Sequence, residues 1–417
     1  VVQIEACPRP SSCAGDSNCF PGATGFMCTA CASGYYTHSN GACAKCTDGM
    51  VTMFWIFITI AFVGVIAAVV GAVLAASSSM APAVVVGSEE AWARSRVPRA
   101  FSTGLLFAQV LAVVAQTALV WPTPMRETLE SLAMLNFSLA YVGGECVLLS
   151  FTTTYKFTVV APGALIVLTA LVAPLLKLCT SRVPSVGLVL ERVVFSAGPV
   201  LYIASSHAAL QLFDCSRLPT GDYVLDADLG FKCFTPQWLA LLPWALVAVF
   251  VYVVGLPAFM ALSLYRARHR LASPDVRARY GLLYRLYKPV FYQFEVLLLF
   301  KRLAIVMAVM FFSRIVVWLM TTLVGVFSVF AAVQLKYAPF VADVYNVLET
   351  RLNVALLIIL SIGAAFWAND FPDDGSYATF AVLGMAVIVV SFVLILHVAL
   401  RELAWSRRHS FRAVAEA

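Results

Sequence analysis

The chain has 417 residues, of which 61% are hydrophobic and 12% are charged, and its formal net charge is +6. Soluble domains are about 45–50% apolar and about 25% charged, so this composition excludes soluble globular, disordered and nucleic-acid-binding proteins. The positive charge does not indicate a nucleic-acid partner, because basic residues of membrane proteins gather on one side of the bilayer. We therefore expect an all-α polytopic membrane protein that has the lipid bilayer as its first partner.

The first 46 residues hold seven of the eleven cysteines and few aliphatic residues. Such a segment cannot bury a core of its own and needs covalent cross-links. These cysteines are Cys7, Cys13, Cys19, Cys28, Cys31, Cys43 and Cys46. Two Cys-x-x-Cys pairs also fit a zinc ribbon, but their separation is short and no His or acidic cluster supports a metal. Disulfides are favoured, which makes residues 1–48 an extracellular Cys-rich module, with a secretion signal expected before Val1.

Nine apolar stretches are long enough to cross a bilayer as helices, which takes about 20 residues each. The predicted spans are 50–76, 101–121, 153–178, 186–213, 237–264, 289–313, 315–336, 347–367 and 377–400. Together they form a membrane domain over 49–404, followed by a basic cytoplasmic tail over 405–417. Residues 125–151 are moderately apolar but contain Glu127, Glu130, Glu145 and the pair Gly143-Gly144, so a tenth span there is the alternative.

The distribution of charge favours nine spans with the N-terminus outside. The inner segments then hold 17 Lys and Arg against 6 Asp and Glu, whereas the outer segments hold 6 against 13. This is the positive-inside pattern, and a tenth span would invert it between the two halves of the chain. We therefore expect 122–152 to be extracellular, at the membrane surface or re-entrant. The basic loop 265–288 is expected inside, where it either binds anionic inner-leaflet lipids or simply anchors the topology.

The same topology places three further cysteines outside. Cys215 and Cys233 bracket the extracellular loop 214–236 and are expected to pair. Cys146 is then expected to pair with one of the N-terminal cysteines, which would tie the Cys-rich module to the membrane domain. Asn136 begins an Asn-Phe-Ser sequon on the outer side and is a candidate glycosylation site.

Short motifs occur in a characteristic order over nearly 400 residues of the chain. They are Cys28-x-x-Cys31 with Gly34-Tyr35-Tyr36, Cys43-x-x-Cys46, Trp121-Pro122, Glu145-Cys146, Phe213-Asp214-Cys215, 223–228 with Cys233, Gly255-Leu256-Pro257, 279–284, Tyr292 and Glu295 with Lys301-Arg302, and Tyr337-Ala338-Pro339 with Asn346 and Glu349. This order resembles the multi-span C-terminal region of large surface proteins of algae and protists that carry ephrin-receptor-like or EGF-like cysteine repeats. That region is similar to transient receptor potential (TRP) channels, so the resemblance implies a TRP-like membrane domain.

Charged residues inside spans are the first candidates for function, because each costs about 2.5–3.5 kcal/mol at the centre of a membrane helix. The sixth span carries Glu295, Lys301 and Arg302, and Glu349 is a candidate partner. One interpretation is a voltage sensor or an ion path. The favoured one is a buried salt-bridge network that holds helices together, since the Arg at every third residue typical of voltage sensors is missing.

Two other features have both a functional and a structural interpretation. Gly255 and Pro257 in the fifth span form a gating hinge or a fixed bend. Asp222, Asp226 and Asp228 in the outer loop suggest a calcium site, although their spacing is not that of an EF-hand. No metal site is firm, and the sequence shows no catalytic constellation, so we expect neither an enzyme nor a cofactor.

The functional hypothesis is a multi-span anchor that holds a larger extracellular protein or fibre in the plasma or ciliary membrane. Other subunits or an extracellular assembly are its expected partners. The alternatives are a TRP-like cation channel or mechanosensor, and a sensory receptor. A standard pore loop between the last two spans is disfavoured, because residues 368–376 provide nine residues for a pore helix and a filter.

Overall fold

The computed structural model describes residues 13–15, 18–24, 28, 30–32, 34–37, 43–78, 99–115, 121–132, 146–147, 150–179, 185–218, 221–312, 315–368 and 374–415. The contacts of the chain divide it into two compact units. Unit 1 comprises Val1–Val70, Phe137–Leu168 and Ala204–Val254, and unit 2 comprises Gly71–Asn136, Thr169–Ile203 and Gly255–Ala417.

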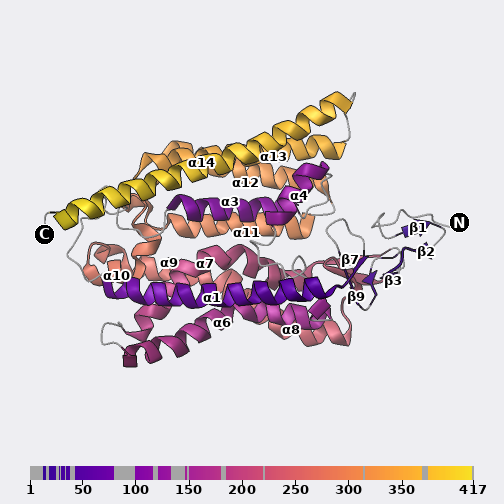
Figure 1. The fold of residues 1–417 in the computed structure, drawn as a ribbon, viewed down its shortest axis with the longest axis horizontal. Helices are drawn as coiled ribbons and strands as arrows, with labels where there is room; N and C mark the ends of the chain where they lie inside the picture. The colour runs from indigo at the N-terminus through magenta and orange to yellow at the C-terminus, as the bar shows by residue number, and fades with distance from the viewer. Residues whose placement is uncertain are drawn as a thin grey trace. The chain divides into compact units, whose positions relative to one another are not determined.

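Helices dominate the structure, and a helix lies on each apolar stretch of the sequence (Figure 1). The long ones are α1 (Asp48–Ser78), α3 (Arg99–Ala115), α6 (Phe151–Cys179), α7 (Val186–Leu210), α8 (Pro236–Ala248), α9 (Leu256–Ala267), α11 (Phe294–Phe312), α12 (Val316–Tyr337), α13 (Asp343–Ala368) and α14 (Asp374–Ala415). Shorter helices are α4 (Thr123–Leu132) and α10 (Pro274–Tyr284), with single turns at Gln211–Phe213, Arg268–Arg270 and Pro289–Phe291.

Six helical segments in the described part of the chain are long and apolar enough to cross a membrane. They are Phe151–Pro174, Val186–Phe213, Pro236–Arg270, Val316–Tyr337, Asp343–Ala368 and Gly375–Ala404. The prediction of a polytopic helical membrane protein is therefore confirmed, whereas nine spans and their orientation stay predictions. Of the other three predicted spans, α1 and α3 have shorter apolar stretches and α11 carries three buried charged residues.

Unit 1 begins with short antiparallel hairpins that are cross-linked by disulfides. The strand pairs are β1 (Cys13–Gly15) with β2 (Asn18–Cys19), β3 (Ala23–Thr24) with β4 (Ala30–Cys31), and β5 (Tyr35–Thr37) with β6 (Cys43–Lys45). Two-stranded hairpins of this size are marginal alone. The bonds Cys19–Cys28 and Cys31–Cys43 join neighbouring hairpin segments, as expected of a module without a large core.

A second small sheet in unit 1 lies between α7 and α8. It contains β7 (Cys215–Arg217), β8 (Tyr223–Leu225) and β9 (Asp228–Lys232) in antiparallel order. The disulfide Cys215–Cys233 closes it, with a sequence separation of 18 residues. The indole nitrogen of Trp238, in the first turn of α8, donates at 3.0 Å to the carbonyl of Leu212, in the turn Gln211–Phe213 that precedes the sheet.

Unit 2 contains the helices that form the candidate site. In this unit α3 packs against α4, α11, α13 and α14, and α12 packs against both α11 and α13. Within the predicted segment 122–152, α4 packs against α3 and α14, and its residues Met125 and Leu129 are fully buried, whereas the outer location of the segment stays a prediction. Hydrophobic residues on one face of this amphipathic helix account for its burial. The last predicted span lies in α14, a single helix of 42 residues that continues into the predicted tail and ends at Ala415.

Close packing of α3 against α14 depends on a glycine. A Cβ at Gly104 would lie 2.6 Å from Cγ2 of Ile395, and small residues at such points let membrane helices approach closely. We expect Gly104→Ala to lower the free energy of unfolding by about 1–3 kcal/mol, the usual result of overpacking. Unfolding in mixed detergent micelles measures this change.

Gly325→Ala in α12 is the matched control for Gly104→Ala. A Cβ at Gly325 would meet nothing within 4 Å, so this helical alanine should be neutral or stabilising by about 0.5–1 kcal/mol. Equal stability of the two variants would contradict the contact between α3 and α14.

The predicted hinge coincides with an irregular helix. A π-helix, η6 (Val249–Gly255), joins α8 to α9, and Pro257 lies in the first turn of α9. Proline has no N–H and cannot continue the normal hydrogen-bond pattern, which accounts for a defect at this point. The division between the two units also falls between Val254 and Gly255.

Candidate functional site: a buried charge network and its cavity

The centre of the network is the carboxylate of Glu295 at the start of α11. Its Oε2 lies 3.1 Å from Nη2 of Arg99 on α3, and its Oε1 lies 3.3 Å from Nη2 of Arg302, two turns further along α11. The side chains of Glu295 and Arg302 are 4% and 5% exposed. Buried charges of this kind need partners, and here one carboxylate serves two guanidinium groups.

Tyr287 adds hydrogen bonds to both Glu295 and Arg99. The Tyr287 hydroxyl donates to Oε2 of Glu295 at 2.5 Å and accepts from Nη2 of Arg99 at 3.1 Å. Burial, reinforced by the nearby Glu295 charge, raises the pKa of Tyr287 well above its usual value, so the phenol stays protonated and can donate. Arg302 also donates through Nη1 to the carbonyl of Pro199 in α7 at 2.9 Å.

Lys301 forms a second part of the network. Its Nζ donates to Oδ1 of Asn353 at 2.6 Å and to Oε1 of Glu349 at 3.3 Å, both on α13. The rings of Phe327 and Phe330 on α12 lie 5.7 and 5.5 Å from the same nitrogen. One ammonium group thus connects three helices through an ion pair, a hydrogen bond and cation–π contacts.

The sequence positions explain why these side chains meet. Glu295 and Arg302 are seven residues apart and therefore lie on the same face of α11, as Glu349 and Asn353 do on α13 at a spacing of four. Arg99 is the first residue of α3. The backbone N–H of the next residue, Ala100, donates to both carboxylate oxygens of Glu402 on α14, each at 3.4 Å. A carboxylate at a helix N-terminus also interacts favourably with the helix dipole.

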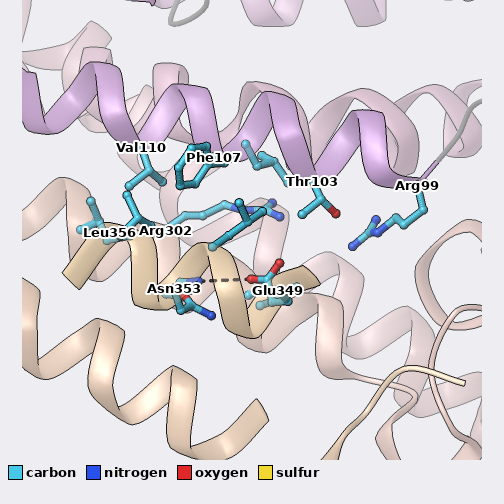
Figure 2. A pocket seen from close by; sticks show the side chains of 13 residues that line it. Arg99, Thr103, Phe107, Val110, Arg302, Glu349, Asn353 and Leu356 are labelled. Atoms are coloured by element: carbon cyan, nitrogen blue, oxygen red, sulfur yellow. Dashed lines mark hydrogen bonds and ion pairs between the residues drawn. The ribbon is translucent and has the colours of Figure 1, made fainter. Parts of the chain in front are cut away.

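A cavity of about 50 Å³ adjoins the network, between α3, α11 and α13. Arg99, Thr103, Lys301, Arg302, Glu349 and Asn353 provide its polar wall, and aliphatic side chains and Phe107 provide the rest. In Figure 2, Arg99 and Arg302 reach into the site from opposite ends, while Glu349 and Asn353 face α3 from below. The arrangement can therefore pair charges and hold a small polar group.

The structure places the four residues of the predicted charge cluster in two ion pairs that adjoin each other on α11, Glu295 with Arg302 and Lys301 with Glu349. Three contributors were missing from the prediction: Arg99, Tyr287 and Asn353. Arg99 and Tyr287 lie just before predicted spans, at the ends of the inner loops 77–100 and 265–288, and nothing in the sequence pattern pairs them with Glu295. Asn353 could have been predicted from the sequence, because it lies one helical turn after Glu349 and therefore on the same face of the helix.

A corner between α12 and α13 positions Tyr287. Ala338 adopts a left-handed conformation with φ +39°, and Tyr287 forms an antiparallel bridge with Phe340. Asn346 secures the corner, since its side chain accepts from the N–H of Phe340 and donates to the carbonyl of the same residue, each at 3.0 Å. The side-chain amide of Gln334 also donates to Asn346, at 2.9 Å.

Asn346→Ala should lower the free energy of unfolding by about 2 kcal/mol or more, because each buried donor left unsatisfied costs about 1–3 kcal/mol. The N–H of Phe340 and the amide of Gln334 would both lose their acceptor. Thr350→Val on the same helix is the control and should change stability by less than 1 kcal/mol, roughly the net value of one hydrogen bond. Detergent unfolding curves compare the two, and equal losses would contradict the role of Asn346.

The three aspartates predicted to bind calcium have separate partners. Asp222 pairs with Lys232 at 2.8 Å, Asp226 accepts from the Ser216 hydroxyl, and Asp228 accepts from the N–H of Gly230. No group of three His, Cys, Asp or Glu side chains in the described ranges is placed to hold a metal ion. The geometry therefore does not support the calcium site.

Of the other predicted sites, the disulfide between the module and the membrane domain is described by the structure, and several others are not. Cys46 and Cys146 form a disulfide across 100 residues of sequence, the kind of link predicted between the Cys-rich module and the membrane domain. Phe54 of α1 packs near this link with Val147. Asn136 and Cys7 lie outside the described residues, as does the side chain of Cys13, so their predicted roles are not addressed by the structure.

Comparison with known families identifies one match. Residues 4–46 are similar to a domain of unknown function, DUF7630. The matched range ends at Cys46 and so covers nearly the whole predicted Cys-rich module. No curated protein and no solved structure matches the chain.

Proposed function

We propose that the chain is a nine-span membrane anchor for the extracellular Cys-rich module and for what that module carries. The observation that carries the proposal is the Cys46–Cys146 disulfide. The module already continues directly into α1, and this bond adds a second covalent attachment just before α6. Because Cys46 lies two residues before α1, the bond fixes the base of the module both to α1 and to the segment before α6, which suits a module that has to transmit force or keep its orientation at a membrane.

The positive-inside distribution of Lys and Arg supports an outer N-terminus and an inner C-terminus. In that orientation α3 and α11 both start at the inner side. Arg99, Tyr287 and Glu295 then lie near the inner boundary, with Lys301 and Arg302 deeper. Nine spans require α1, α3 and α11 to cross as well, and α11 can do so because its three charged side chains are paired with protein groups rather than exposed to lipid.

The charge network favours an anchor over a voltage sensor or a hydrated ion path. Each of its three cations has a carboxylate partner, at 3.1 to 3.3 Å, and the network connects α3, α11 and α13. A moving sensor would have to break these contacts in a buried setting, where unpaired charges are most costly. We infer that the network fixes helix positions and makes the bundle a rigid base.

A secretion signal followed by a fluorescent protein, both fused before Val1, tests the anchor function in cells. We expect the fusion to remain at the cell surface after an alkaline carbonate wash and to be released by detergent. A version that ends at 48 is the control and should be released into the medium. Cation currents from the purified chain in planar bilayers, or recovery of the fusion in the wash, would contradict the anchor as its principal function.

A further inference from the structure

We propose that the cavity between α3, α11 and α13 binds one oxyanion group of the size of a phosphate. This inference goes beyond the anchor function, since an anchor needs no ligand. It rests on the charge of the cavity wall, on a buried nitrogen without an acceptor, and on the size of the cavity.

The wall of the cavity has more positive than negative groups. Arg99, Lys301 and Arg302 line it together with a single carboxylate, that of Glu349. Glu295 offsets part of the charge of the two guanidinium groups but does not line the cavity. A metal cation would face three cationic groups against two carboxylates, whereas an anion would face a net attraction, and charge interactions are strong in a buried setting.

A hydrogen-bond donor in this wall lacks an acceptor. Nε of Arg99 is buried and has no hydrogen-bond partner among the described residues. A buried donor in this state costs about 1–3 kcal/mol, and in proteins such groups usually meet water or an ion. Thr103, one turn further along α3 and 8% exposed, places a hydroxyl in the same wall. Figure 2 shows Arg99 and Thr103 on the side of α3 that faces the cavity.

The size of the cavity restricts the ligand. Its volume of about 50 Å³ corresponds to a few water positions, each of which takes about 10–15 Å³ on this measure. A phosphate group fits, but a whole lipid or nucleotide does not. Guanidinium groups match phosphate oxygens in geometry and charge. The phosphate belongs either to a soluble ion or to a lipid head group, whose acyl chains would remain outside the cavity.

Binding can be measured on the purified full chain with inorganic phosphate as one probe. The second probe is a nanodisc of phosphatidylcholine with or without phosphatidic acid. We expect a saturable rise of the unfolding temperature with one of the two probes. Thr103→Leu should weaken it about tenfold or more, because leucine fills part of the cavity and removes a donor while every charge remains.

Arg99→Lys is the second variant, since it keeps the charge but lacks Nε, and it should weaken the same response. Arg268→Gln removes an exposed cation that does not line the cavity and should leave the response unchanged. A response to phosphate alone identifies a soluble ion as the source, and a response to phosphatidic acid alone identifies a lipid head group. The proposal is overturned if neither probe stabilises the chain, or if Thr103→Leu, folded as judged by gel filtration, responds like Arg268→Gln.

Discussion

Replacing Glu295 with glutamine is expected to lower the free energy of unfolding by about 3–5 kcal/mol, the usual loss when one partner is removed from a buried ion pair. The neutral amide would leave Arg99 and Arg302 without a compensating charge, although both are now within 3.3 Å of the same carboxylate. Its NH2 group would replace one carboxylate oxygen and would face donors there, either that of Arg302 or those of Arg99 and Tyr287. Unfolding in mixed micelles, followed by circular dichroism, measures the loss.

Glu191→Gln provides the matched control. Glu191 pairs with Arg279 at 3.4 Å, and the side chains of Arg279 and Glu191 are 48% and 25% exposed, against 5% and 4% for Arg302 and Glu295. Exposed pairs contribute about 0–1 kcal/mol, so this variant should be close to wild type. The double variant Glu295→Gln/Arg302→Gln should lose less than the sum of the single variants, because the two residues are in contact. Similar stabilities for Glu295→Gln and Glu191→Gln would show that the network does not hold the bundle together.

The second large effect concerns the Cys46–Cys146 disulfide. If a protease site is inserted between residues 84 and 89, cleavage separates the two cysteines into different fragments. We expect the fragments to run as one band in non-reducing denaturing gels and as two bands after reduction. The double variant Cys46→Ser/Cys146→Ser should give two bands in both conditions. It should also unfold more easily, since closing a loop of 100 residues contributes about 4–5 kcal/mol in the chain-entropy account.

The pair Cys215→Ser/Cys233→Ser is the control for this experiment. Its two cysteines lie 18 residues apart on the same fragment, so its loss should leave the single non-reduced band intact. Its effect on stability should also be smaller, at about 3 kcal/mol, because the loop is shorter. A single non-reduced band from Cys46→Ser/Cys146→Ser would show that another pair of cysteines joins the two fragments.

The sequence predicts the helices well because a membrane span needs a long apolar run, and such runs are easily read. The packing of a short amphipathic segment is less predictable. The distribution of charge favours an outer segment over 122–152, but it does not show that Met125 and Leu129 of α4 are buried. Burial of a short amphipathic helix depends on the neighbours that cover it, and these are far away in sequence.

The candidate site shows the same limit. Glu295, Lys301 and Arg302 stand out because charged residues are rare in apolar runs, and Glu349 is a natural partner for them. Arg99 could not be found in this way, since it precedes its apolar run and looks like an ordinary topology signal. Its contact with Glu295 spans 196 residues and exists because α3 packs against α11. The three aspartates are the opposite case, where nearness in sequence suggested a site that the separate partners of each carboxylate do not support.

The most direct test of the account is the sidedness of the chain. Epitope tags before Val1, after Gly221, after Leu271 and after Ala417 can be probed with antibodies on intact and on permeabilised cells. Nine spans predict that the first two tags are accessible on intact cells and the last two only after permeabilisation. Finding the tags before Val1 and after Ala417 on the same side would contradict an odd number of spans, and with it the proposed anchor.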